Sequence, residues 1–214
     1  MVVTAHALAT KASLAILQQG GNSIDAAVAA SFVLSVVRPQ STGIGGGGFL
    51  LFYSSNTKEY KAYDFRERAP LLATKDMFVD AQGEPKDFTY KGKIIPRASL
   101  NGPLSIGTPG LVAGLLHVHN KHGLLELTKI MKPAITIAEK GFEVYATLAQ
   151  AIEKRKTIIA HFSATKKIFF KEGLPLKKGE LLVQKDLANT LRLIAKYGTK
   201  GFYQGEVAQK IVRT

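Results

Sequence analysis

Cysteine is absent from this 214-residue sequence, and several kinds of chemistry are absent with it. Without a thiol, the chain has no disulfide framework, no thiolate metal site and no cysteine nucleophile. No apolar run approaches the roughly 20 residues that a membrane helix needs. Residues 1–10 also lack the basic start and apolar core of a signal peptide. As written, the sequence is therefore expected to carry neither an export signal nor a membrane anchor.

Acidic residues are scarce relative to basic ones, and the net charge is +13. Residues 108–214 hold 18 basic and 8 acidic side chains, with the excess gathered in short runs at residues 154–156, 166–171 and 177–178. These runs fit a solvated face, a surface that steers an acidic substrate or partner, or a nucleic-acid site. No RNA-binding sheet motif, zinc finger or basic zipper supports the last of these, so no nucleic acid is expected as a partner.

The composition excludes a disordered chain, because 46% of the residues are hydrophobic and only 21% are charged. Apolar periodicity predicts a first helix over residues 5–19, ended by two glycines. A second helix follows, capped by Asn22 or Ser23 with Asp25 in its first turn. Residues 26–37 are apolar on every side, so this helix must be buried. We expect a sheet to cover it.

Two strands and a helical region follow. Residues 49–53 and 59–65 predict a hairpin. Residues 80–105, rich in glycine, proline and charge, are interpreted as a surface excursion. Apolar patterning then predicts helices over residues 111–121, 125–140 with an interruption at Pro133, 147–159, 185–197 and 206–212. The pattern indicates an α+β fold with a largely helical second half.

The run Gly43-Ile44-Gly45-Gly46-Gly47-Gly48 matches the letters of a dinucleotide-binding fingerprint. That fingerprint needs a strand before the glycines and a helix after them, because the pyrophosphate sits on the helix N-terminus. Here the order is reversed, and no Lys-Ser/Thr pair follows to make a P-loop. Consecutive glycines persist where backbone segments approach closely. The run is therefore either a tight core turn or a wall of an active site.

Two arginines, Arg66 and Arg68, follow the second predicted strand. A guanidinium is a rigid fork that matches a carboxylate in a bidentate pair. If the strand continues, the two arginines lie on one side and Glu67 on the other. Arg66 can form a surface salt bridge or anchor a carboxylate ligand, and the residues alone leave both readings open.

No catalytic group or metal site is evident. His117, His119 and His122 lie close in sequence, but 117 and 119 face different sides of a helix and no carboxylate completes a ligand set. We interpret them as solvated or core-edge histidines and expect neither a metal nor a cofactor. No serine lies in a nucleophile elbow, and no pair of carboxylates is arranged for acid–base work.

Long blocks of the sequence, in order, resemble the large subunit of the γ-glutamyltranspeptidases, which belong to the N-terminal-nucleophile hydrolases. The matching blocks are residues 6–10, 20–27, 39–49, 65–70, 74–78, 107–114, 133–134, 138–142, 182–188 and 201–205. The resemblance implies a four-layer αββα sandwich shared by two subunits. It also implies that residues 1–214 form a single incomplete domain, with helices and a core hairpin at 1–80, the excursion at 81–105 and a mainly helical part at 106–214.

The resemblance implies a precursor that cleaves itself, freeing an N-terminal threonine that attacks the γ-carbonyl of glutathione or a related γ-glutamyl compound. The γ-glutamyl group then passes to water or to an amino acid. Arg66 falls on the family arginine that binds the α-carboxylate of that group. The resemblance implies a location in the periplasm or outside the cell, whereas the residues themselves, which include no signal peptide, leave the location of this chain open.

The nucleophilic threonine is expected to be missing, because in the family it lies downstream and begins the small subunit. Thr214 has nothing after it and cannot become a free N-terminal nucleophile. Met1 resembles an internal methionine of the family pattern. We therefore expect a large-subunit fragment that is inactive alone; the alternative is a non-catalytic remnant or a module that binds γ-glutamyl ligands or a homologous subunit.

Overall fold

The computed structural model describes residues 1–213, and the chain separates into two compact units. The first contains Met1–Glu67, Pro109–Phe142 and the chain from Val183 onward, and the second contains Arg68–Thr108 and Glu143–Leu182. The α+β fold and the largely helical second half are confirmed. The single domain over residues 1–214 stays a prediction. Among the described residues, the helices are all too short or too polar to traverse a lipid bilayer.

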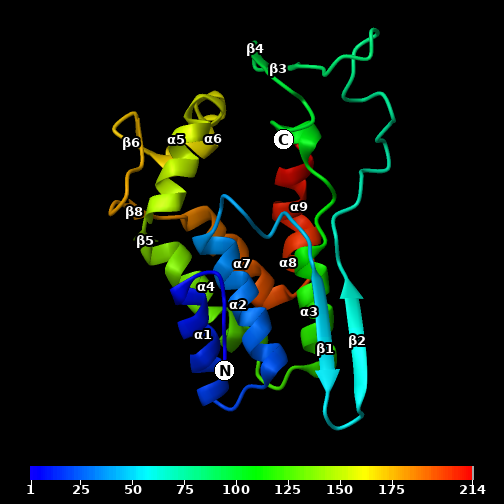
Figure 1. Cartoon of the computed structure of the whole chain (residues 1–214), viewed down its shortest axis with the longest axis vertical. Coiled ribbons are helices and arrows are strands. Elements are labelled where there is room, and N and C mark those ends of the chain that lie inside the picture. Colours follow the sequence, from blue (N-terminus) through cyan, green and yellow to red (C-terminus); the bar gives the residue numbers. More distant parts are fainter. Residues whose placement is uncertain (214) are drawn as a thin grey trace. The chain divides into compact units, whose positions relative to one another are not determined.

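The first unit is a cluster of helices flanked by one hairpin. Its helices are α1 (Ala7–Gln18), α2 (Ser23–Val37), α3 (Leu111–His122), α4 (Leu127–Lys140), α7 (Lys185–Tyr197), α8 (Lys200–Tyr203) and α9 (Gly205–Val212). Helix α2 packs against α1, α3 and α4, and α4 packs in turn against α7 (Figure 1). The core of this unit is therefore a helical one.

Helix α2 is largely buried, as its composition predicts, against other helices. Val28, Phe32 and Val36 are fully buried, and the elements in contact with the helix are α1, α3 and α4. The small side chains of Ala26 and Ala29 allow neighbouring helices to approach closely. One stripe of the helix, at Ala27, Ser31 and Leu34, is only half-buried. The covering sheet therefore stays a prediction.

The N-terminus of α2 is fixed by a buried carboxylate. The side chain of Asn22 accepts the backbone N–H of Asp25, and the Asp25 carboxylate accepts the N–H of Asn22 at 3.0 Å, which completes a capping box. Asp25 is fully buried and also accepts the N–H groups of Leu124, at 3.1 Å, and Leu125, at 3.3 Å. Asp25, which the sequence predicts in the first turn of α2, therefore also connects this helix to the loop between α3 and α4.

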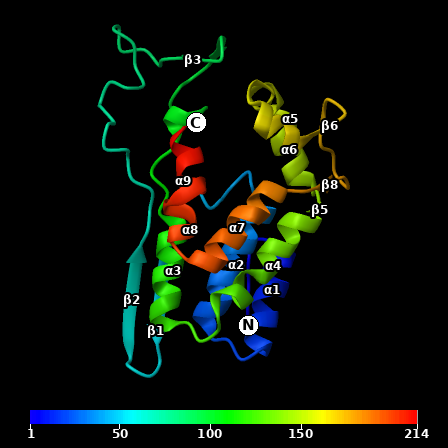
Figure 2. The same cartoon turned by 180° about the vertical axis from the view of Figure 1, so that it is seen from behind.

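The hairpin pairs β1 (Phe49–Ser54) with β2 (Glu59–Asp64) in antiparallel register, Phe49 opposite Asp64 and Ser54 opposite Glu59. Strand β2 contacts α3, which runs beside the hairpin in both views (Figures 1 and 2). The other face carries apolar side chains that remain exposed. They are Phe49 at 67%, Leu51 at 86%, Tyr53 at 46% and Tyr60 at 85%.

The second unit contains more structure than the sequence predicts. Its elements are the hairpin of β3 (Phe88–Tyr90) and β4 (Lys93–Ile95), the 3₁₀ turn Pro103–Ser105, helices α5 (Ala146–His161) and α6 (Ser163–Phe169), the hairpin of β6 (Phe170–Lys171) and β7 (Leu174–Pro175), and β8 (Leu181–Leu182), which pairs with β5 (Phe142–Glu143). The chain over 80–105 is not only a surface excursion, because Ile95 and Ala98 are fully buried. Lys91 and Gly92 both have positive φ, as a two-residue hairpin turn requires.

Helix α4 continues through Pro133, against the predicted interruption. Proline removes one backbone hydrogen bond and crowds the preceding turn, which normally breaks a helix. Here Ile130, Met131, Ala134 and Ala138 are all fully buried on either side of the proline. This packing compensates for the lost bond. The same dominance of packing explains why the short helices α6 and α8, with weak patterns of their own, escaped prediction.

Replacing Asp25 with alanine is expected to lower the free energy of unfolding by about 3 kcal/mol, since the N–H groups of Asn22, Leu124 and Leu125 lose their buried acceptor. Urea denaturation followed by circular dichroism measures the loss. Asp186→Ala, in the first turn of α7, is the matched control and should change stability by less than about 0.5 kcal/mol. Equal losses in the two variants would contradict the assigned role of Asp25.

Candidate functional site

The candidate site is the exit from β2, where the chain turns at Arg66. The ladder of the hairpin extends one pair beyond the strands, with mutual backbone hydrogen bonds between Gly48 and Phe65 at 3.0 and 3.2 Å. The Asp64 side chain then accepts the N–H of Arg66 at 2.9 Å. This local bond competes with further strand pairing and ends β2. These hydrogen bonds therefore fix the backbone position of Arg66.

The glycine turn presses against the backbone of that exit. A Cβ added to Gly47 would lie 2.5 Å from the Phe65 carbonyl oxygen, 2.7 Å from the Glu67 nitrogen and 2.8 Å from the Arg66 carbonyl carbon. From the other segment, a Cβ at Gly110 would meet the carbonyl oxygens of Phe65 and Arg66, and one at Gly114 would overlap the Phe65 ring. Glycines from two segments thus hold the backbone around Arg66, and we refer to Gly47, Gly110 and Gly114 as the glycine clamp.

The clamp is closed by hydrogen bonds to the start of α3. The Gly46 carbonyl accepts the N–H groups of Gly110, at 3.0 Å, and Leu111, at 2.9 Å. Since no side chain caps α3, this carbonyl satisfies donors that would otherwise be unpaired. The Tyr203 hydroxyl donates to the Pro109 carbonyl at 2.9 Å and accepts the Ala113 N–H at 3.2 Å. Burial raises the pKa of Tyr203, so the hydroxyl stays protonated and able to donate.

The Arg66 side chain is 57% exposed and only partly paired. Its Nε lies 3.4 Å from Glu67 Oε2, and its guanidinium lies 6.0 Å from the centre of the Phe49 ring. Within residues 1–213, no ion pair or hydrogen bond engages its terminal nitrogens. Arg66 is exposed and Glu67 is half-buried, as expected if the two side chains lie on opposite sides of the chain. The Arg66 guanidinium nevertheless reaches the Glu67 carboxylate. The arrangement leaves one edge of the fork open to an anionic ligand.

Arg68 is the other predicted arginine, and it has a different setting. It opens the second unit, where its backbone exchanges two hydrogen bonds with Thr108, at 2.7 and 3.2 Å. Of the two arginines, only Arg66 has its backbone in contact with the glycine clamp. The substrate-binding role of Arg66 stays a prediction at this point.

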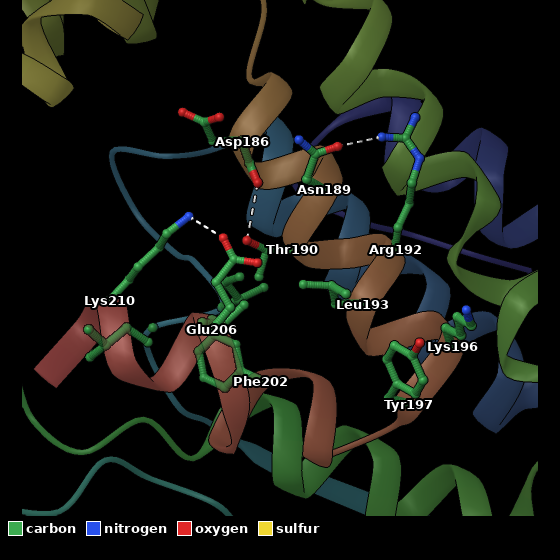
Figure 3. Close-up of a pocket in the computed structure, with 14 residues that line it drawn as sticks. Asp186, Asn189, Thr190, Arg192, Leu193, Lys196, Tyr197, Phe202, Glu206 and Lys210 are labelled. Atoms are coloured by element: carbon green, nitrogen blue, oxygen red, sulfur yellow. Dashed lines mark hydrogen bonds and ion pairs between the residues drawn. The ribbon is translucent and has the colours of Figure 1, made fainter.

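A cavity of about 820 Å³ lies beside the glycine turn in the first unit, lined by Ile44 and Gly45 and by side chains of α7, α8 and α9. Figure 3 shows Glu206 and Lys210 paired across one turn of α9. Arg192 bonds Asn189 and, on α4, Glu139. Among the charged residues that line the cavity, Glu206 and Lys210 pair with each other, and Arg192 pairs with Glu139 outside the lining. The glycine run is a tight turn that also borders a cavity; a wall of an active site stays a prediction.

His119 and His122 pack against neighbours of α3, whereas His117 is exposed, with its ring centre 6.0 Å from that of Tyr63. His119 is buried, with Nε2 2.9 Å from the Leu125 carbonyl and 3.5 Å from Asp25. His122 Nε2 lies 2.6 Å from the Tyr63 hydroxyl. Burial lowers the pKa of His122, and the nearby Lys61 and Lys121 lower it further. Among the described residues, no group of three or more potential ligands could hold a metal ion.

Comparisons with known proteins identify the family of the chain. The sequence profile of the family described as gamma-glutamyltranspeptidase matches residues 9–214. The chain belongs to the γ-glutamyltranspeptidase family. It is 41% identical to the glutathione hydrolase proenzyme of Bacillus subtilis (strain 168) and 42% identical to that of Escherichia coli (strain K12), over all of this chain in both cases. The resemblance stated from the sequence blocks is confirmed.

The solved structures agree with the sequence relatives. The chain matches the crystal structure of Helicobacter pylori γ-glutamyltranspeptidase with a TM-score of 0.89 and 43% identity, covering 99% of this chain and 58% of that one. The Bacillus anthracis transpeptidase CapD matches with a TM-score of 0.79, 35% identity and 99% of this chain, 63% of that one. The chain spans 35% of the length of the two bacterial proenzymes.

Sequence reasoning missed several residues that build the site. Gly110, Gly114 and Tyr203 lie far from the glycine turn in sequence, and only packing brings them to Arg66. Their signal was present, since residues 107–114 and 201–205 were among the blocks that match the family. The sequence did not show what those blocks contact.

Adding one methyl group to the clamp is expected to destabilise the fold. Gly47→Ala should lower the free energy of unfolding by about 2 kcal/mol, because its Cβ would overlap backbone atoms that cannot rotate away. Gly45→Ala is the matched control in the same turn, since nothing lies within 4 Å of a Cβ there; we expect a change within about 0.5 kcal/mol. Urea denaturation of both variants measures the difference. Similar stabilities would show that the clamp is looser than described.

Proposed function

We propose that this chain is the large-subunit portion of a γ-glutamyltransferase or glutathione hydrolase, with Arg66 as its anchor for the α-carboxylate of the γ-glutamyl group. The observation that carries the proposal is the exposed guanidinium on a backbone fixed by the glycine clamp. A preorganised fork loses little freedom when it binds a carboxylate, so it can hold the substrate in one orientation. The names of the two bacterial relatives, glutathione hydrolase proenzyme, support glutathione as the substrate class.

The reaction that we propose needs a nucleophile from the part of the relatives that this chain does not match. An N-terminal threonine supplied there would attack the γ-carbonyl, with its own amine taking the hydroxyl proton, while Arg66 holds the other end of the substrate. The γ-glutamyl amide bond would break, the departing amine would take that proton, and the γ-glutamyl group would remain as an ester on the threonine. The acyl group would then pass to water or an amino acid. The chain alone would bind but not turn over a γ-glutamyl compound.

We further propose that the small subunit covers the exposed face of the β1–β2 hairpin. An isolated two-stranded hairpin with an apolar face in water is marginally stable. The exposed Phe49, Leu51 and Tyr60 are the surface that a second sheet would bury, as in the four-layer sandwich that the resemblance implies. Phe49 also lies beneath the Arg66 guanidinium, so the covering sheet would bring its residues next to the anchor. From the family alone, we place the assembled protein in the periplasm or outside the cell.

Binding of L-glutamate tests the anchor directly. We expect Arg66→Ala to weaken binding by about tenfold or more, because the lost charge-assisted pair contributes about 1.5–3 kcal/mol. Titration of isotope-labelled chain followed by NMR measures the affinity. Arg192→Ala is the control, since Arg192 is also a partly exposed arginine paired with a glutamate. Unchanged affinity in Arg66→Ala, or an equal loss in both variants, would refute the role.

Turnover of a γ-glutamyl anilide distinguishes the two functional readings. The purified chain should release no more aniline than a blank, and activity should appear when the remaining portion of a homologous proenzyme is co-expressed with it. Release by the chain alone would contradict an external nucleophile. Glutamate binding that depends on Arg66 but never leads to activity in the complemented protein would favour a non-catalytic binding module.

A further inference from the structure

The basic runs that the proposed function leaves unused meet in the second unit. Lys154 and Lys156 come from α5. Lys177 and Lys178 come from the segment after β7, which α6 and the β6–β7 hairpin separate from α5. Helix α5 packs against β7, and a groove of about 650 Å³ lies between them. All four lysines line this groove, so tertiary structure turns two separate runs into one surface, the basic groove.

The lining of the basic groove is apolar between the lysines. It comprises Ala149 from α5 together with Leu174, Pro175 and Leu176. Leu176 is almost fully buried, whereas Leu174 is 61% exposed. The segment is held in place by the turn at Glu172 and Gly173, both at positive φ, and by the bond from the Leu176 N–H to the Phe169 carbonyl at 2.9 Å. The groove therefore has a fixed apolar strip with ammonium groups around it.

The charges around the groove are not balanced within the chain. Among the described residues that line it, Glu153 is the only acidic one, and its carboxylate lies 2.5 Å from Lys156 Nζ. The nearby Glu180 accepts the Lys177 backbone N–H and lies 3.9 Å from Lys171 Nζ. Within residues 1–213, no ion pair involves the ammonium groups of Lys154, Lys177 or Lys178. Three cations thus face the groove without a counter-charge.

We propose that the basic groove binds an acidic peptide segment, with carboxylates on the lysines and an apolar side chain on the strip beside Leu174. Complementary charge attracts and orients such a partner, and the apolar contact adds affinity that charge alone does not supply. This interaction goes beyond the γ-glutamyl chemistry and involves only residues of the second unit.

A peptide fits the groove better than other anions do. Single-stranded nucleic acid is bound by aromatic side chains that stack on bases, and the described residues that line the groove include no aromatic one. A duplex phosphate backbone would leave the apolar strip exposed to water. A sulfated polysaccharide would leave the apolar strip exposed to water. A flat lipid surface would contact only some of the lysines around a groove, so a lipid surface fits this site less well than a peptide does.

The probe is a fluorescently labelled peptide of glutamates with leucine at regular intervals, and a second peptide of glutamates alone. Fluorescence anisotropy with the full chain measures affinity at low and at raised salt. We expect the double variant Lys177→Glu, Lys178→Glu to weaken binding of the leucine-containing peptide at least about tenfold, since two attractions become repulsions. The matched control, Lys166→Glu with Lys167→Glu, makes the same charge change on α6, outside the groove.

Leu174→Ser tests the apolar strip, and it should weaken the leucine-containing peptide while leaving the all-glutamate peptide unchanged. Equal loss in the two double variants would overturn the proposal, because net charge alone would then explain binding. No measurable binding to wild type would overturn it as well. Tighter, groove-dependent binding of a heparin fragment, an oligonucleotide or vesicles containing phosphatidylglycerol would assign the groove to that other partner and refute the peptide.

Discussion

The close approach of two backbone segments is the constraint on which the rest of this site depends. Gly47 lies against the peptide groups that flank Arg66, and Gly110 approaches the same peptide groups from the start of α3. Side chains rearrange at modest cost, but backbone atoms in a paired ladder do not. The glycine clamp therefore fixes the backbone of Arg66 relative to the helical core through direct backbone contacts.

At two places in the first unit, a single polar group accepts hydrogen bonds from more than one backbone N–H group. The Gly46 carbonyl serves as the cap of α3, and the buried Asp25 carboxylate serves both α2 and the loop that follows α3. In each case a group from one segment satisfies donors of another that would otherwise be buried without a partner. The hairpin, the glycine turn and the helices consequently form one connected arrangement around Arg66, while one face of the hairpin remains apolar and exposed.

Local patterns gave most of the regular structure correctly. The helices α1, α2, α3 and α7 follow from apolar periodicity with polar or glycine ends, and the β1–β2 hairpin from alternation around a turn. The errors have a common cause, which is that packing outweighed local preference. Pro133 stays inside α4 because its neighbours are buried. A Lys-Gly turn, less distinctive than Asn-Gly, concealed the β3–β4 hairpin.

The sequence alone determined the family, since long blocks in register extend over the whole chain, and it singled out Arg66 within them. It also determined the excess of lysine, because composition needs no fold. Only the tertiary structure decided what these residues face. Whether a glycine run is a turn or a clamp depends on which backbone lies within contact distance of it. Likewise, separated lysines become one groove only when α5 packs on β7. Contacts between residues distant in sequence are fixed by packing, which no local pattern encodes.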